Sequence, residues 1–96
     1  MAEKPTYRID GAAFSDLEGF YDEIEAQLLD GASWGRDLDA LDDLLHGNVG
    51  PVPADFRIVW EHTDLSHRRL DATGAGSFDA LVRLISAHAN VELILS

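Results

Sequence analysis

The 96-residue sequence predicts a single α/β domain with a parallel sheet. Three short segments have the apolar or alternating character of strands, and segments with apolar residues at helical spacing separate them. Parallel strands require crossover connections of this kind, which are almost always right-handed. The length fits one hydrophobic core, so we expect residues 1–96 to fold as one unit.

The first strand and the first helix lie in the N-terminal third of the chain. Residues 6–10 alternate polar and apolar side chains, with Tyr7 and Ile9 on one face of the predicted strand. Ser15 and Glu18 have the spacing of a capping box, in which both side chains satisfy backbone donors at a helix start. The helix that follows carries an apolar stripe made of Leu17, Phe20, Tyr21, Ile24 and Leu28.

A second helix is predicted after a connection that contains Gly31 and Gly35. Asp37 is suited to be its N-cap, because an aspartate oxygen accepts a hydrogen bond from a backbone donor of the first turn. Gly47 is expected to end the helix. Its predicted apolar stripe consists of Leu38, Leu41, Leu44 and Leu45.

The second half of the chain continues the alternation. Residues 48–55, with one glycine and two prolines, are predicted to form a loop, and residues 56–60 a buried strand. A polar segment follows, in which we expect one short helical turn around residues 65–70 and then a break at two glycines. Ser77 is predicted to cap a last helix, and residues 91–95 to form the last strand.

Composition and charge restrict the partners of the protein. Eighteen acidic and seven basic residues give a formal net charge of −11, which repels nucleic acid and anionic membranes and favours a cationic partner. Solubility alone also explains this charge, and net charge by itself favours that explanation. The chain has no cysteine for a disulfide framework, and its N-terminus lacks the apolar stretch of a signal peptide. We therefore expect a cytoplasmic protein.

The second helix is predicted to carry an acidic face opposite its leucines. Asp39, Asp42, Asp43 and His46 share this face because they fall at positions i, i+3, i+4 and i+7. The helix dipole explains Asp39, which lies in the first turn. It explains Asp43 less well, since Asp39 and Asp43 form a like-charge pair that costs about 0.2–0.5 kcal/mol. The spacing supports equally a partner that neutralises this face and simple solubility.

The segment around this helix resembles the barstar family. Residues 34–47, WGRDLDALDDLLHG, are similar to the family's pattern aromatic-Gly-x-Asn-Leu-Asp-Ala-Leu-x-Asp-x-Leu-x-Gly, with Asp37 in place of the asparagine. Residues 9–17 resemble the family's first strand and helix, Trp60 its middle strand and residues 94–96 its C-terminus. The resemblance therefore spans nearly the whole chain.

The resemblance implies a three-stranded parallel sheet, in the order 1-2-3, packed against helices. It also implies that a monomer inhibits a small, basic, secreted ribonuclease of the guanyl-specific type in a 1:1 complex, without catalysis or a cofactor. The second helix and the preceding loop would enter the cationic active site, where carboxylates replace RNA phosphates. Asp43 corresponds to the family's most deeply inserted carboxylate, Asp39 to its second one, and Gly35 to a close backbone approach. The predicted partner-binding residues are Asp43, Asp39, Gly35, Asp37, Trp34, Asp42, His46 and Ser33.

Departures from the family's pattern concern the partner more than the fold. Ser33, Asp42 and Asn48 stand where barstar itself carries aromatic residues, a residue type that often anchors interfaces. Arg83 and Leu84 lie around the place where barstar offers a further interfacial acid. For Trp34 we favour packing on its own domain over contact with a partner, because it is an aromatic residue beside a helix start.

Other functions compete with this one. An enzyme lacks a candidate constellation, because the four histidines form no HExxH pair and no GxxxxGK phosphate loop is present. Asp43 and His46 could bind one divalent metal ion, but the helix dipole explains a histidine in the last turn, so no metal site is predicted. The same acidic helix would also suit an immunity protein or antitoxin against a different basic toxin, or a protein-interaction module.

Overall fold

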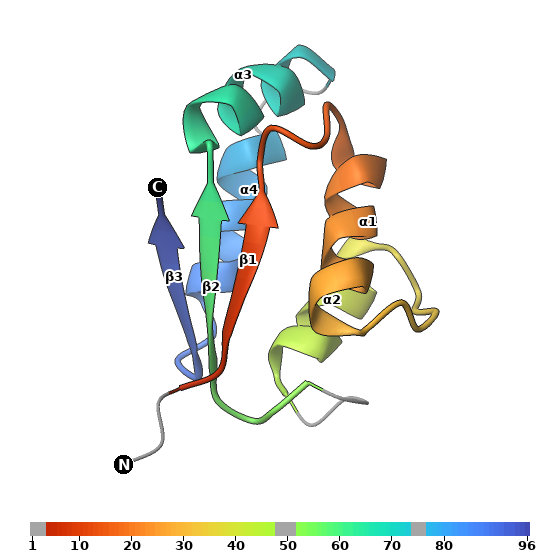
Figure 1. Cartoon of the computed structure of the whole chain (residues 1–96), viewed down its shortest axis with the longest axis vertical. Coiled ribbons are helices and arrows are strands. Elements are labelled where there is room, and N and C mark those ends of the chain that lie inside the picture. Colours follow the sequence, from red (N-terminus) through yellow and green to blue (C-terminus); the bar gives the residue numbers. More distant parts are fainter. Residues whose placement is uncertain (1–3, 48–51, 74–76) are drawn as a thin grey trace.

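The computed structural model describes residues 4–47, 52–73 and 77–96. The strands are all parallel and pair in the order β1-β2-β3, which confirms the expected topology. In Figure 1, α4 lies behind the sheet, α1 stands beside β1, α2 lies near the lower end of α1, and α3 crosses the top. The elements in chain order are β1 (Thr6–Asp10), α1 (Leu17–Leu28), α2 (Leu38–Leu45), β2 (Phe56–Glu61), α3 (Thr63–Thr73), α4 (Ser77–Ser86) and β3 (Val91–Leu95).

The two faces of the sheet differ in burial. One face carries the buried residues Phe56, Ile58 and Trp60 of β2. On the opposite face, ion pairs join Arg8 to Glu61 at 3.3 Å and Arg57 to Glu92 at 3.2 Å. The prediction of a buried central strand therefore holds for one face only, because a strand turns alternate side chains to opposite faces.

Trp60 lies at the centre of the core and links the sheet to the helices. Its ring centroid is 5.1 Å from that of Phe20 on α1 and 5.0 Å from that of Phe78 on α4. The buried indole Nε1 donates a hydrogen bond to the Ser66 hydroxyl of α3 at 2.9 Å, and this hydroxyl donates to the Gly11 carbonyl at 3.1 Å. A buried N–H needs such a partner, so one side chain joins β2 to three helices.

Two helix predictions need correction. Asp16, not Ser15, caps α1, because the Asp16 carboxylate accepts a hydrogen bond from the Gly19 backbone N–H at 2.9 Å and the helix begins at Leu17. The capping box was therefore placed one residue too early. The short turn expected around residues 65–70 is the middle of the longer helix α3, which the packing of Ser66 and the buried Leu70 onto the core stabilises.

The remaining predicted elements agree with the structure where it describes them. The first and last strands have the predicted bounds, whereas Ser77, predicted to cap the last helix, is the first residue of α4 itself. The expectations for residues 48–51 and for the break at Gly74 and Gly76 lie outside the described residues.

Candidate partner-binding face

Helix α2 is held in place by its two caps and a short apolar stripe. The Asp37 carboxylate accepts a hydrogen bond from the Ala40 backbone N–H at 2.7 Å, so Asp37 is the N-cap, as predicted. Gly47 follows the helix with a φ of 85°, a conformation that glycine adopts without strain, and its N–H donates to the Leu44 carbonyl at 3.0 Å. The buried residues of the helix are Leu41, Leu44 and Leu45.

Leu38 does not belong to the buried stripe. It is 45% exposed, whereas Leu41, three residues later, is fully buried. The prediction for Leu38 was wrong because helical spacing places a residue on a face but does not say how far along that face another element covers it. The first turn of α2 therefore presents an apolar side chain next to Asp39.

The structure divides the predicted acidic face into two parts. Asp39 and Asp43, here called the acidic pair, are both exposed, and neither carboxylate has a hydrogen bond or ion pair within the part of the chain that the structure describes. Asp42 instead lies 3.0 Å from Nε2 of His88, which follows α4. His46 lies beside Asp42, and its Nδ1 is 2.8 Å from the Asp42 carbonyl oxygen. We call Asp42, His46 and His88 the histidine cluster.

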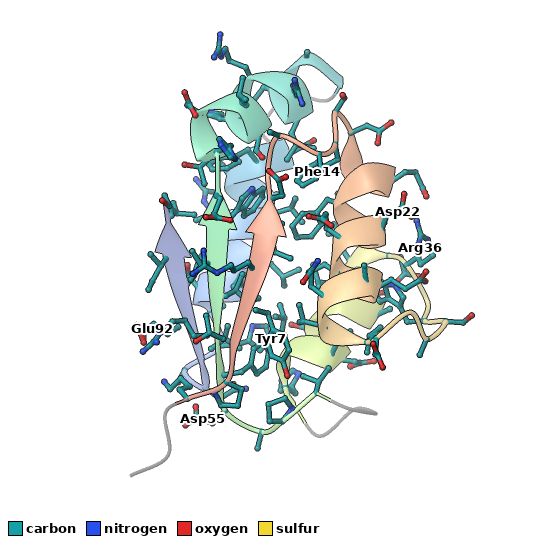
Figure 2. The ribbon with its side chains drawn as sticks, in the orientation of Figure 1. Tyr7, Phe14, Asp22, Arg36, Asp55 and Glu92 are labelled. Carbon is teal, nitrogen blue, oxygen red and sulfur yellow. The ribbon has the colours of Figure 1, made fainter. Side chains whose placement is uncertain are left out.

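A second acidic stripe runs along α1, and the chain neutralises it itself. Glu18, Asp22 and Glu25 fall at i, i+4 and i+7, and Arg36 from the loop before α2 binds all three carboxylates, at 3.1, 2.6 and 3.4 Å. Figure 2 shows Arg36 beside Asp22 on the outer side of α1. The hydrogen bonds from Asp22 and then Glu18 raise the pKa of the Arg36 guanidinium above its ordinary value. Arg36 therefore ties this loop to α1.

Arg36 was not predicted from the sequence. The residue has a φ of 55°, in the left-handed region, and it binds side chains that lie 11 to 18 positions earlier in the chain. No local pattern connects such distant positions. A signal was nevertheless present, because three acids at helical spacing on the predicted first helix had no basic residue beside them.

We expect Arg36→Gln to loosen the loop of residues 29–37 without unfolding the domain. Glutamine lacks the charge that holds three carboxylates, so amide protons of this loop should exchange several-fold faster. Hydrogen exchange followed by mass spectrometry measures this rate. Arg8→Gln, which removes one ion pair on the open face of the sheet, is the control and should leave the loop unchanged. Wild-type exchange rates in Arg36→Gln would show that Arg36 does not anchor the loop.

With this geometry established, comparison with known proteins gives the family. A family model described as barstar, the barnase inhibitor, matches residues 4–93. The chain belongs to the barstar family. Membership implies a role of the ribonuclease-inhibitor type and agrees with the parallel sheet in the order β1-β2-β3. A search of curated proteins found none that matches the chain.

The loop that resembles the barstar family's aromatic-Gly segment packs on its own domain. The Trp34 ring lies against Tyr21 of α1 in an edge-to-face arrangement, with centroids 5.4 Å apart. Burial raises the pKa of Tyr21, and the charges of Asp37 and Glu18 raise it further. At Gly35 an added Cβ would lie 2.7 Å from the Ala40 Cβ, so the first turn of α2 itself requires a residue without a side chain there. Ser33 is exposed, and Asn48 lies outside the described residues.

One motif was overlooked in the sequence. Residues 31–35 read GASWG, which has the GxSxG spacing of a nucleophile elbow. That elbow requires a strand before the serine and a helix directly after it, whereas this segment connects α1 to α2. Ser33 also has no hydrogen bond to a histidine among the described residues. The spacing therefore has no catalytic context in this fold.

Two further expectations concern metal ions and membranes. The sequence suggested Asp43 with His46 as the pair that could share a metal ion, but the structure places Asp42 and His88 beside His46 instead. His88 was missed because it is brought to α2 by tertiary packing from the other end of the chain. Among the described residues, no helix is both long and apolar enough to cross a membrane.

Proposed function

We propose that this protein is a cytoplasmic inhibitor of a small, basic, secreted ribonuclease of the guanyl-specific type. It blocks the cationic active site of the enzyme with α2 and the loop of residues 29–37, as a monomer in a 1:1 complex. Asp43 and Asp39 make the main contacts, and the protein itself catalyses nothing. The residues that surround these two in the interface are Ser33, Trp34, Gly35, Asp37, Asp42 and His46.

The contrast between two acidic helices carries this proposal. On α1, Arg36 binds the three carboxylates of the acidic stripe and so offsets the repulsion between them. The acidic pair on α2 is exposed and has no cation among the described residues. Asp39 and Asp43 are one turn apart on a helix fixed by its N-cap and three buried leucines. A partner with positive charges can therefore bind them without rearranging the helix.

The chemistry of a ribonuclease active site fits the acidic pair. Such a site binds RNA phosphates with basic side chains, and a carboxylate can occupy a phosphate position and accept charge-assisted, often bidentate, hydrogen bonds from arginine. In addition, opposite net charges speed the encounter of the two proteins. The inhibitor's net charge of −11 favours such steering.

A second candidate keeps the acidic helix and changes the target. Arg83 and Ser33 are exposed where barstar carries an acid and an aromatic residue, respectively. These differences favour a partner whose surface differs from that of barnase, so the protein would be an immunity protein or antitoxin against another basic toxin. A general acidic interaction module is the third candidate, and a pull-down that recovers basic proteins but no nuclease or toxin would support it.

Titration of a panel of small basic secreted ribonucleases tests the proposal. We expect at least one enzyme to lose its activity fully at one equivalent of the full chain. The double variant Asp39→Asn/Asp43→Asn should fail to inhibit that enzyme at this ratio. Asp64→Asn/Asp71→Asn removes the same charge from α3, which lies at the other end of the sheet (Figure 1), and should inhibit normally. Absence of inhibition across the panel, or equal loss in both variants, would refute the proposal.

A further inference from the structure

The histidine cluster brings together three potential metal ligands that are far apart in the sequence. Asp42 lies in the middle of α2, His46 is the C-cap of this helix, and His88 lies in the turn between α4 and β3. Each residue offers one ligand atom, and these atoms lie within 4.8 Å of one another. The His88 side chain is only 7% exposed, whereas those of Asp42 and His46 are 43% and 65% exposed. The cluster is therefore a buried imidazole at the base of an accessible site.

The hydrogen bonds of His88 leave one nitrogen facing a carboxylate. Nδ1 lies 2.8 Å from the Leu84 carbonyl oxygen, which can only accept, so Nδ1 carries a hydrogen and donates it. In the neutral ring Nε2 then has a lone pair, and it lies 3.0 Å from Asp42 Oδ1, which also has only lone pairs to offer. Two lone pairs at this distance repel each other, and either a hydrogen shared between the two atoms or a metal ion would remove this repulsion.

His46 makes the same kind of backbone contact and supplies the third ligand; its Nδ1 lies 3.9 Å from Asp42 Oδ2. Its Nδ1 is 2.8 Å from the carbonyl oxygen of Asp42, four residues earlier, as that of His88 is from Leu84. Histidines that bind metals commonly donate their other ring N–H to a backbone carbonyl, which fixes the tautomer and leaves Nε2 for the metal. The two rings meet edge to face, with centroids 4.8 Å apart. A lone ion pair between Asp42 and His88 would not need this second imidazole.

We propose that Asp42, His46 and His88 form a binding site for one divalent transition-metal ion of the zinc class. Ligand atoms about 2.0–2.1 Å from a tetrahedral zinc ion lie about 3.3 Å from each other, close to the 3.0 Å between Asp42 and His88. The exposed His46 ring reaches the ion by turning toward it, and water fills the fourth position. Two imidazoles and one carboxylate suit zinc and its neighbours better than calcium or magnesium. This inference does not depend on the target of the acidic pair.

Other histidine–carboxylate pairs in the chain show what the cluster adds. His67 lies 3.0 Å from Asp71, and His62 lies 3.2 Å from Asp10, but each of these pairs offers two ligands only. Among the described residues, Asp42, His46 and His88 are the one group that offers three. His67→Gln is therefore a matched control, since it removes an imidazole from a histidine–aspartate pair on a different helix.

Calorimetric titration of the metal-free full chain with zinc chloride tests the site. We expect saturable binding of one ion per chain, and a blue-green absorption from tetrahedral Co²⁺ that zinc abolishes. His46→Gln, which changes an exposed side chain, and His88→Gln should each weaken zinc binding at least tenfold. His67→Gln should bind zinc as the wild type does. Asp43→Asn should also keep the site, because the cluster uses Asp42.

The outcomes separate a metal site from an ion pair. If Asp42 and His88 form only an ion pair, the wild type will show no saturable zinc binding, and the proposal fails. It also fails if zinc binding persists unchanged in both His46→Gln and His88→Gln, because the ion then binds elsewhere. Circular dichroism of each variant shows whether it is folded, and His46→Gln keeps the test valid should His88→Gln unfold. Loss of ribonuclease inhibition plays no part in these measurements.

Discussion

Asp43→Asn is expected to weaken binding of the cognate ribonuclease about a hundredfold or more while leaving the melting temperature of the free protein almost unchanged. A hydrogen bond to a charged group contributes about 1.5–3 kcal/mol, and each 1.4 kcal/mol corresponds to a tenfold change in affinity. The enzyme's basic groups would also lose their counter-charge, which adds to the loss. In the free protein the Asp43 side chain is exposed and the substitution removes repulsion from Asp39, so folding should not suffer.

Surface plasmon resonance measures the affinity, and differential scanning calorimetry measures the melting temperature. Asp64→Asn removes the same charge from the first turn of α3 and is the control, for which we expect nearly wild-type affinity. Asp39→Asn should show a smaller loss than Asp43→Asn, in keeping with its place as the second carboxylate. If Asp43→Asn reduces stability as much as affinity, the role of Asp43 is structural, and the proposed function loses its central contact.

Leu41→Ala should strongly lower the stability of the protein. Leu41 is fully buried, and truncation of such a leucine costs about 2–5 kcal/mol through lost burial and the cavity that remains. Because α2 has only eight residues, its stability comes from this packing more than from helix propensity. Urea denaturation measures the free energy of unfolding. Binding of a ribonuclease should weaken as well, since the acidic pair then lies on a less ordered helix.

Leu38→Ala is the matched control on the same helix. The side chain is 45% exposed, and surface substitutions usually change stability by less than about 0.5 kcal/mol. Helical spacing alone assigned both leucines to one buried stripe. Comparing the two variants shows whether the spacing or the burial seen in the structure predicts the loss of stability. Similar losses of stability in Leu38→Ala and Leu41→Ala would show that the first turn of α2 is buried in solution.

Much of the fold was predictable from residue patterns. The first and last strands and helix α2 follow from alternation, helical spacing and a capping aspartate, all of which act over a few residues. The error at Ser15 arose because Asp16 lies next to it and caps equally well, so the choice depended on where the helix packs. The length of α3 was underestimated for a similar reason, since its buried residues are few and its mean composition is polar.

The candidate site was predictable in part. Spacing placed Asp39 and Asp43 on one face of α2, and the structure shows both exposed there. Spacing did not distinguish these two residues from Asp42, which differs from them because its carboxylate contacts His88. The resemblance to the barstar family assigned Gly35 to a close approach by the partner, and the structure adds a requirement within the chain, the contact with Ala40.

The sequence by itself determined the strand and helix order, the capping aspartate of α2 and the acidic character of its outer face. These properties depend on neighbours within one or two helical turns, so the residues that cause them lie side by side in the chain. Only the tertiary structure decided which acidic side chains interact with an arginine or a histidine. Arg36 neutralises the stripe on α1, and His88 meets Asp42 and His46, because folding brings together residues whose separation in sequence no local pattern can bridge. On α2, this packing leaves the acidic pair exposed.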